Sequence, residues 1–514
     1  MEEHSNISIH QEKNNQPTTL RTEKDTNNLV IPYETAVVPT EENKIIKSEI
    51  PSSKINENNK NNNENNYEKN SEIQSNKINC LDKFCGQTTP GGSISGAIFA
   101  MTSLSIGTGC LTFTKKVIQF GFVWFGVALI IGGIATYWTL VGLIKAAKKV
   151  KDTEYSSSVR KVIGKFPAIL VDVMTIIYSW GIVITYEIIM NSLIGRVIYI
   201  FFKNKETYPS FNDYADKEWN SIKIKAIVLV SMNVLLTPLC LAKDIGKMKF
   251  FSLFGIVALF YTIIVLVVEC PFFWSHYLNK VYQKDDKSTH ANWVDISRAF
   301  NKNLDFFTGF ATIVFSFSCH QGSLPVYRTL NSNDESIMNT IFRRSIILDL
   351  IIYFTIYIAS FLTTPLKSED LIIFRESIFN NDIFMNIAKI SIFLELFFLI
   401  PSNYNSFRCS LFHMIFGNED VKIIPNIILT ISTLVVSALI GALYSEILNY
   451  ISLLGGFCCT TYCFSVPGWM MIKSEWNEMS KFKRILTIIG IGLLSIVGYI
   501  GGIMSVIICF KGTD

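Results

Sequence analysis

The feature that most constrains this chain is a series of long apolar runs that begins after Gly91. A helix needs about 20 mostly apolar residues to cross the hydrocarbon core of a bilayer. Eleven runs reach that length, at 94–118, 121–144, 167–199, 224–242, 250–270, 305–325, 342–363, 383–402, 424–444, 447–471 and 485–509. They do not alternate between polar and apolar residues, as the strands of a membrane barrel would. The sequence therefore predicts an all-α integral membrane protein with eleven transmembrane helices.

Charge divides the chain into two parts near residue 90. The first 89 residues hold 14 Asp and Glu against 10 Lys and Arg, together with 17 Asn. The stretch from Asn56 to Asn79 is Asn-rich and buries too little apolar surface to offset the entropy of ordering it. We therefore expect a disordered tail over residues 1–90 and a transmembrane domain over residues 91–510. Only 17% of all residues are charged, below the roughly 25% of soluble domains, which excludes an ordinary soluble enzyme.

Lysine and arginine cluster in alternate loops between the predicted spans, and such loops lie on the cytoplasmic side of a membrane. The basic loops follow spans two, four and ten and contain Lys145, Lys148, Lys149, Lys151, Arg160, Lys161, Lys165, Lys243, Lys247, Lys249, Lys473, Lys481, Lys483 and Arg484. We therefore expect a multi-pass membrane protein with a cytoplasmic N-terminus, in the plasma membrane or an acidic vacuole membrane. Because the basic residues explain topology, the net charge of +4 does not indicate a nucleic-acid partner.

Two of the predicted spans carry residues that interrupt a helix. Span one has Gly107-Thr108-Gly109 at its centre, and span six has the polar run Ser316–Gln321 followed by Pro325. One such break is explained by close helix packing, since small residues line membrane interfaces. Two breaks, in the first helix of each of two five-span halves, indicate the substrate site of a secondary transporter. The free N–H and carbonyl groups at half-helix ends suit the carboxylate and ammonium groups of an amino acid.

Five motifs in this order resemble the amino acid/auxin permease family, a branch of the amino acid–polyamine–organocation superfamily, in its apicomplexan type with an Asn-rich N-terminal tail. The similarity covers residues from about Gly91 to Ile508. The motifs are IGTGCL at Ile106–Leu111, TPLCLAKDIGKMKFFS at Thr237–Ser252, FSFSCHQGSLPVY at Phe315–Tyr327, Pro401 with Arg408, and the glycine-rich run Leu453–Lys473 with its late proline.

The resemblance implies a LeuT-like fold of two inverted five-helix repeats plus a C-terminal helix, with helices one and six broken. It also implies transport of amino acids by alternating access. Tyr186 stands at an aromatic position of helix three. Its side chain could reach the substrate carboxylate; the alternative role is packing between helices. Carried over by position, the other predicted substrate-binding residues are Gly107, Thr108, Gly109, Cys110, Leu111, Phe315, Ser316, Phe317 and Ser318.

Residues of helix eight indicate which ion is coupled to transport. Sodium-coupled members of the family place a hydroxyl just before the proline that Pro401 matches, whereas this chain has Phe397–Ile400 there. The resemblance therefore favours proton-coupled or facilitative transport, although Ser391 and backbone carbonyls leave sodium possible. Glu187 and Glu395 lie deep within spans three and eight, and carboxyl groups at such depth are usually functional. A carboxyl group away from water holds its proton more tightly, so either glutamate could carry H⁺.

The remaining ionisable groups within spans indicate little chemistry. Asp172 lies near a cytoplasmic end, and we expect Asp349 to pair locally with a residue such as Arg344. His320 has no second His, Cys or carboxylate at ligand spacing, so we predict no metal and assign it a hinge or capping role in helix six. No cofactor motif and no nucleophile–base pair occurs, so the chain is not predicted to be an enzyme. A structural glutamate remains the alternative at both Glu187 and Glu395.

A second class of function uses the same pocket. An amino-acid sensor would signal through the cytoplasmic tail when the substrate site is filled, with tail-binding proteins that the sequence does not identify. A transporter without residues 1–85 would keep its flux, whereas a sensor would lose partner binding and show little flux. The predicted partners of the transporter are an amino acid and the lipid bilayer, together with H⁺ where transport is proton-coupled.

Overall fold

The computed structural model describes residues 88–511 except for 90–91, 203–206, 209, 243–248, 284–304, 331–334, 365–368, 380–381, 417–422 and 445. The expected tail therefore lies outside the described residues, apart from Thr88 and Thr89. These two form strand β1, which pairs antiparallel with β2 (Gly92–Ser93) directly before the first helix. The boundaries predicted for the tail and the transmembrane domain thus stay predictions.

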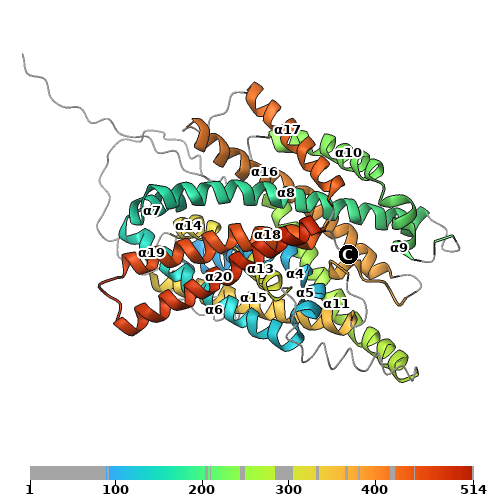
Figure 1. Ribbon diagram of the computed structural model, residues 1–514, viewed down its shortest axis with the longest axis horizontal. Helices are drawn as coiled ribbons and strands as arrows, with labels where there is room; N and C mark the ends of the chain where they lie inside the picture. Colours follow the sequence, from blue (N-terminus) through green and yellow to red (C-terminus); the bar gives the residue numbers. More distant parts are fainter. Residues whose placement is uncertain are drawn as a thin grey trace, which may run out of the picture. The chain divides into compact units, whose positions relative to one another are not determined.

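The first predicted half of the membrane domain is helical throughout its described residues (Figure 1). Helix one is divided into α3 (Ile94–Ser105), α4 (Thr108–Leu111) and α5 (Phe113–Phe120). The other elements of this half are α6 (Phe122–Lys149), α7 (Tyr155–Val162), α8 (Lys165–Phe202), α9 (Phe211–Tyr214), the π-helix η2 (Ala215–Trp219), α10 (Ile222–Leu241) and α11 (Lys249–Gln283).

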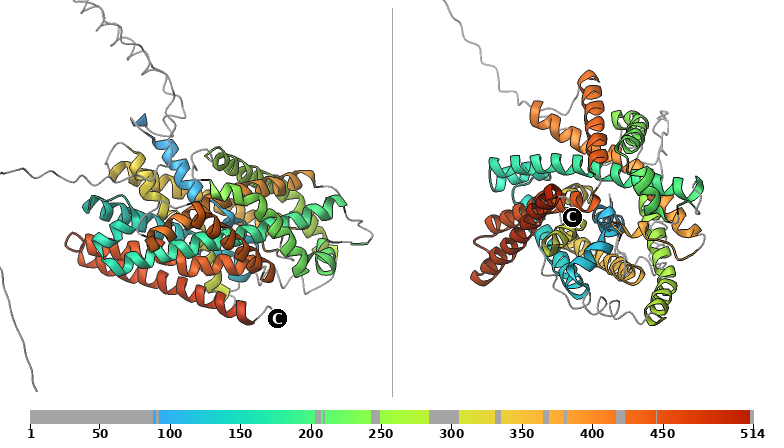
Figure 2. Two further views of the ribbon diagram at one scale, coloured as in Figure 1. Left: turned by 90° about the horizontal axis from the view of Figure 1, so that it is seen from above. Right: turned by 45° about the vertical axis from the view of Figure 1, so that its right-hand side comes forward.

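The second predicted half also begins with a broken helix. Helix six is divided into α13 (Asp305–Ser316) and α14 (His320–Thr329). The elements that follow are α15 (Glu335–Thr363), the 3₁₀ turn η4 (Ile372–Phe374), α16 (Ile383–Phe416), α17 (Ile423–Leu443), α18 (Ile447–Leu454), the π-helix η5 (Gly455–Ser465), α19 (Val466–Ser474) and α20 (Lys481–Lys511). The terminal helix α20 runs along the edge of the bundle beside α18, η5 and α19 (Figure 2).

The all-helical membrane architecture is confirmed. Within the described residues, nine helical segments are long and apolar enough to cross a bilayer. They coincide with nine of the eleven predicted spans, and the two others are helices one and six, whose halves are each too short. Many large apolar side chains along these helices, such as Ile134 and Val234, are exposed, as lipid-facing residues would be.

Some helices are longer than the predicted spans because they continue past the apolar run. The predicted span 383–402 is part of α16, which extends to Phe416 through the polar residues around Arg408. Span ten, predicted as one helix, is α-helical only at its ends and is wound as a π-helix from Gly455 to Ser465. A Cβ atom on Gly455 would lie 2.0 Å from the carbonyl oxygen of Ala311, so this segment approaches α13 closely.

Candidate functional site

Helix one is interrupted at Ile106 and Gly107, between α3 and α4. Gly107 has extended backbone dihedrals, with φ −143° and ψ −162°, which end the helical run. A Cβ atom on Gly107 would meet no atom within 4 Å, whereas one on Gly109 would lie 2.7 Å from Ser316 Oγ and 2.8 Å from Phe315 Cδ1. The first glycine therefore borders open space, and the second allows helix one to pack closely against helix six.

Helix six is interrupted at Phe317–Cys319, between α13 and α14. The new start of the helix is held by His320, which is fully buried and whose Nε2 lies 2.8 Å from the hydroxyl of Thr139 on α6. This contact fixes the position of α14 against a continuous helix. No side chain in the described residues caps the first turn of α14, so the hinge or capping role of His320 stays a prediction.

One tyrosine connects the two breaks. Tyr353 of α15 is fully buried, and its hydroxyl lies 2.9 Å from the carbonyl oxygen of Ser105 and within hydrogen-bonding distance of that of Ser316. These carbonyls belong to the last residues of α3 and α13. The last carbonyl groups of a helix have no N–H donor within that helix. A hydroxyl has a single proton, so Tyr353 donates to one of these carbonyls at a time.

The long helix α8 contacts both breaks through two further tyrosines. Tyr186 is buried beside the side chain of Thr108 in α4. Tyr178, two turns earlier, forms a 2.9 Å hydrogen bond with Ser318 Oγ in the break of helix six. The predicted substrate residues at 107–111, 186 and 315–318 are thus gathered at two breaks that face one another. The sequence did not single out Tyr178 and Tyr353, although Tyr353 follows the intramembrane Asp349 by one helical turn.

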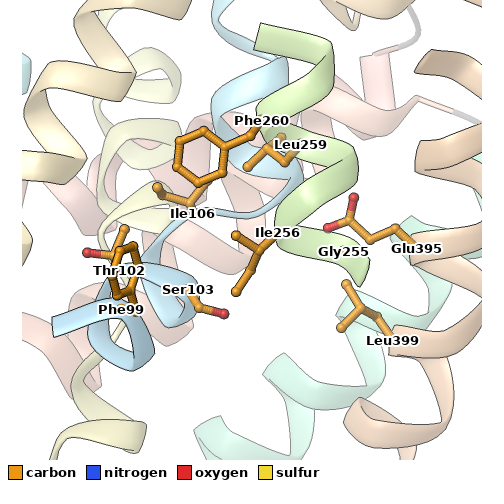
Figure 3. Close-up of a pocket in the computed structure, with 10 residues that line it drawn as sticks. All are labelled: Phe99, Thr102, Ser103, Ile106, Gly255, Ile256, Leu259, Phe260, Glu395 and Leu399. Carbon is orange, nitrogen blue, oxygen red and sulfur yellow. The ribbon is translucent and has the colours of Figure 1, made fainter. Parts of the chain in front are cut away.

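Glu395 lies beside helix one. Its side chain extends from α16 toward Gly255 of α11, where a Cβ atom would lie 2.9 Å from Glu395 Cγ (Figure 3). The same side chain lines a cavity of about 50 Å³ whose other walls include Thr102, Ser103 and Ile106 at the end of α3. That volume holds a few water molecules and is too small for an amino acid. Within the described residues, Glu395 forms no hydrogen bond and no ion pair.

Glu187 lies in a different place. It is fully buried on α8 and is directed toward α10, next to Asn233 and Cys240. Neither of its carboxyl oxygens has a hydrogen-bond partner. Although Tyr186 is its neighbour in sequence, the two side chains leave α8 in directions about 100° apart, as helix geometry requires. The structure therefore separates the two predicted proton carriers, and Glu395 is the one beside a helix break.

Asp349 departs from its expected surroundings. The carboxyl group is fully buried, faces Thr102 and Ser105 of α3, and has no hydrogen-bond partner on either oxygen. The expected local pairing with Arg344 is wrong, because residues five apart in a helix lie on different faces. Asp349 is thus a second intramembrane carboxyl group, after Glu395, that lies against the half-helix α3.

Three ion pairs hold the loop between α15 and α16. Its central residues, 371–374, are buried, and its charged residues reach three different helices. The pairs are Lys115–Asp370 at 3.1 Å from α5, Arg196–Glu369 at 3.3 Å from α8, and Arg375–Glu269 from α11, of which the last is almost fully buried. The loop is therefore fastened to the α5 segment of helix one and to α8 and α11.

Other side-chain clusters in the described part of the chain offer no metal site. Within those residues, no three His, Cys, Asp or Glu side chains come together in a way that would hold a metal ion. The nine cysteines described there are all free thiols.

Comparison with known proteins agrees with this geometry. Residues 90–508 match the family model of the transmembrane amino acid transporter protein. The chain is 22% identical to sodium-coupled neutral amino acid transporter 7 of Mus musculus over 80% of its length and 87% of the relative, and 24% identical to that of Danio rerio over 78% and 85%. It is 20% identical to sodium-coupled neutral amino acid symporter 2 of Danio rerio over 83% and 84%.

Two solved structures cover most of the chain at low similarity. One is a sodium-coupled sialic acid symporter in a substrate-bound, outward-open state, with a TM-score of 0.47 and 12% identity over 86% of this chain and 94% of that one. The other is MhsT in complex with L-phenylalanine, with a TM-score of 0.47 and 12% identity over 82% and 99%. The family match extends over the whole helical body, including both breaks. The chain therefore belongs to the transmembrane amino acid transporter protein family and is a secondary transporter of amino acids.

Proposed function

We propose that this transporter carries neutral amino acids, binds them between the two helix breaks and couples their movement to protons through Glu395. Peptide N–H groups at the starts of α4 and α14 lack helical acceptors and would receive the substrate carboxylate. Carbonyl groups at the ends of α3 and α13 would receive the ammonium group. The substrate is assigned as neutral because none of the ten residues predicted at the site carries a charge. The names of the relatives also specify neutral amino acids.

The observation that carries proton coupling is the place of Glu395. Its carboxyl group lies in a cavity too small for substrate, against the half-helix that leads into the break. A glutamate side chain can carry one proton, and the opening or closing of such a cavity would change its access to water. Movement of α3 during alternating access would open or close this cavity, so proton binding and substrate binding would act on the same half-helix.

Sodium coupling is the second candidate. The curated relatives are named sodium-coupled, and two hydroxyl groups, Thr102 and Ser103, share the cavity with Glu395. The hydroxyl of Thr102 has no hydrogen-bond partner. From α16 the cavity receives Leu399 and Glu395, and the carboxyl oxygens of Glu395 would serve sodium as well as a proton, so the ion gradients in the test below separate the two candidates.

The test is uptake of labelled neutral amino acids into proteoliposomes under an imposed pH gradient, an imposed sodium gradient, both or neither. We expect the pH gradient to drive accumulation, and Glu395→Gln to leave exchange of labelled for unlabelled substrate intact while abolishing that accumulation. Glu187→Gln is the matched control, a buried glutamate away from the breaks, and it should keep proton dependence. Accumulation driven by sodium alone, or proton dependence that survives Glu395→Gln, would contradict the assignment.

Orientation and the tail belong to the same proposal. The basic loops would be cytoplasmic, with the N-terminal tail on that side, in the plasma membrane or an acidic vacuole membrane. The tail would be dispensable for transport, so a chain lacking residues 1–85 should retain full uptake. Little uptake by the unmodified chain, together with partner binding that the deletion abolishes, would favour the sensor alternative.

A further inference from the structure

Two hydrogen bonds join the continuous helix α8 to helix six. The Tyr178 hydroxyl lies 2.9 Å from Ser318 Oγ, and Gln321 Nε2 donates to Thr175 Oγ1 at 2.9 Å. On each helix the two side chains are three residues apart, so they lie on one face about one turn from each other. The two hydrogen bonds are therefore consecutive contacts along a single interface between α8 and helix six.

These contacts lie between the helix breaks and the basic loop that precedes α8. Helix α8 begins at Lys165, at the end of that loop, and α14 runs from its break toward Arg328, which donates to the Thr153 carbonyl of the same loop at 3.2 Å. Figure 1 shows α14 beside the end of α8 that follows α7. Farther along α8, beyond these contacts, Tyr186 lies beside Thr108 in α4. A substrate held between the breaks is therefore separated from the basic loop by the interface between α8 and α14.

The break in helix six separates α14 from α13 at the same place. Ser318 lies within the break, and Gln321 lies in the first turn of α14. Tyr178 reaches both sides of the break, because its ring lies 5.9 Å from that of Phe315 near the end of α13 while its hydroxyl contacts Ser318. The two contacts therefore hold α14 against α8 at the point about which the half-helix would pivot.

The polar side chains of this interface are half-buried, although they lie within apolar spans. Cys319 and His320, which lie between Ser318 and Gln321 in sequence, are fully buried. Polar groups inside a membrane protein face the bundle interior or a water-filled space. Water that enters can take the place of both hydrogen bonds, so each costs little free energy to open. Contacts of this kind suit a part of the protein that opens and closes in every transport cycle.

We propose that Thr175 and Tyr178 control the release of substrate toward the basic loops by positioning α14 against α8. The proposal rests on the substrate site proposed above, between the two breaks. When α14 moves away from α8, both hydrogen bonds break together and the site opens beside Ser318, one of the predicted substrate-binding residues. When the hydrogen bonds form again, the site is closed on this side.

Two cysteines near the interface can report this movement. Cys319 lies within the break of helix six, between Ser318 and the start of α14. Cys459 of η5 lies 3.2 Å from the Tyr462 hydroxyl, and the ring centroids of Tyr462 and Tyr178 are 5.4 Å apart. Both thiols are fully buried in the closed arrangement. Their alkylation therefore requires this region to open.

The first measurement is alkylation of Cys319 and Cys459 by N-ethylmaleimide in the full chain in proteoliposomes, resolved by mass spectrometry of peptides. Cys409, half-buried on the extension of α16, is the internal reference. Loss of one neutral hydrogen bond favours the open arrangement by a factor of roughly 2 to 10. Tyr178→Phe and Thr175→Val should each raise the alkylation rate of both thiols by that factor.

The second measurement is efflux of a labelled neutral amino acid from preloaded proteoliposomes. The same two variants should speed efflux, because an interface that is open more often releases substrate sooner. Thr175→Ser keeps the acceptor hydroxyl and should give native rates in both measurements. Ser437→Ala is the matched control, because it removes the 2.9 Å hydrogen bond from Trp180 Nε1 that joins α8 to α17 and leaves helix six untouched. This control should change neither rate.

Native alkylation rates in Tyr178→Phe and Thr175→Val would overturn the proposal. An equal rise in Ser437→Ala would also overturn it, because the rise would then come from general loosening of α8. Faster alkylation with unchanged efflux would show a movement that does not control release and would likewise count against the proposal. Alkylation needs no ion gradient, so failure of proton coupling through Glu395 would show in the gradient experiments and leave this result in place.

Discussion

Replacing Tyr353 by Phe removes a hydroxyl that joins the ends of the two broken helices. In the native chain this hydroxyl contacts the carbonyl oxygens of Ser105 and Ser316, and the ring is fully buried. Because a hydroxyl donates one hydrogen bond at a time, the substitution leaves one further buried carbonyl without a donor. The cost of such a carbonyl is about 1–3 kcal/mol. If that free energy holds the two breaks in the geometry that binds substrate, the substrate Kd should rise by roughly 5- to 150-fold.

The matched control is Tyr357→Phe, four residues along the same helix. Its hydroxyl donates a 2.7 Å hydrogen bond to the Phe122 carbonyl. That carbonyl lies in the continuous helix α6 and keeps its helical partner, so the loss should be about 0.5–1.5 kcal/mol of stability with no change in substrate Kd.

The assay for both variants is equilibrium binding of a labelled amino acid to purified protein, together with the midpoint of thermal unfolding in detergent. We expect both midpoints to fall, but only Tyr353→Phe to raise the Kd. An unchanged Kd for Tyr353→Phe, or an equal rise for the two variants, would refute the inference that Tyr353 organises the breaks.

Three further predictions concern stability in detergent. Gly109→Ala should destabilise the folded chain by about 1–3 kcal/mol, because the new Cβ would lie 2.7 Å from Ser316 Oγ. This loss should exceed the ~1 kcal/mol that alanine gains in helix propensity. A raised unfolding midpoint would contradict the prediction. Glu269→Gln should lower the free energy of unfolding by about 3–5 kcal/mol, because it leaves the Arg375 charge, only 1% exposed, without its partner. The double variant with Arg375→Leu should recover much of that loss. A double variant without recovery would count against the ion pair. Partial burial opposes ionisation of Asp152, but hydrogen bonds from Lys161 and Ser157 outweigh it and lower its pKa. The contribution of Asp152 to the free energy of unfolding is therefore present above the unfolded pKa of about 4 and is lost as pH falls through the lower pKa of the folded state. Asp152→Asn should therefore make the unfolding midpoint depend less on pH in this acid range.

The two breaks could be predicted from the sequence because they are local. Glycines and a polar run inside otherwise apolar spans are visible without any knowledge of packing, and the structure breaks helices one and six within those segments. The apolar runs likewise predict the long helices, since the bilayer sets their minimum length. Helix ends were less well predicted, because α16 continues to Phe416 where hydropathy no longer marks it.

The contacts between distant helices could not be predicted in this way. The Tyr353 hydroxyl meets Ser105, 248 residues earlier in the chain, and no local pattern records that distance. The rotation of each helix about its axis is also absent from hydropathy, so Glu187 and Glu395 looked equivalent although only Glu395 lies beside helix one. The same reason explains the error at Asp349, whose face of α15 is turned toward α3 and away from Arg344.

If substrate binds at the break of helix one, a leucine side chain at Gly107 should exclude it. A side chain at Gly107 would enter open space, so the variant should fold with an unfolding midpoint near that of the native chain. The measurement is equilibrium binding of the labelled amino acid that the native protein transports best. We expect saturable binding by the native chain and none by Gly107→Leu at the same concentrations. Binding by Gly107→Leu with an unchanged Kd would contradict it and place the substrate elsewhere.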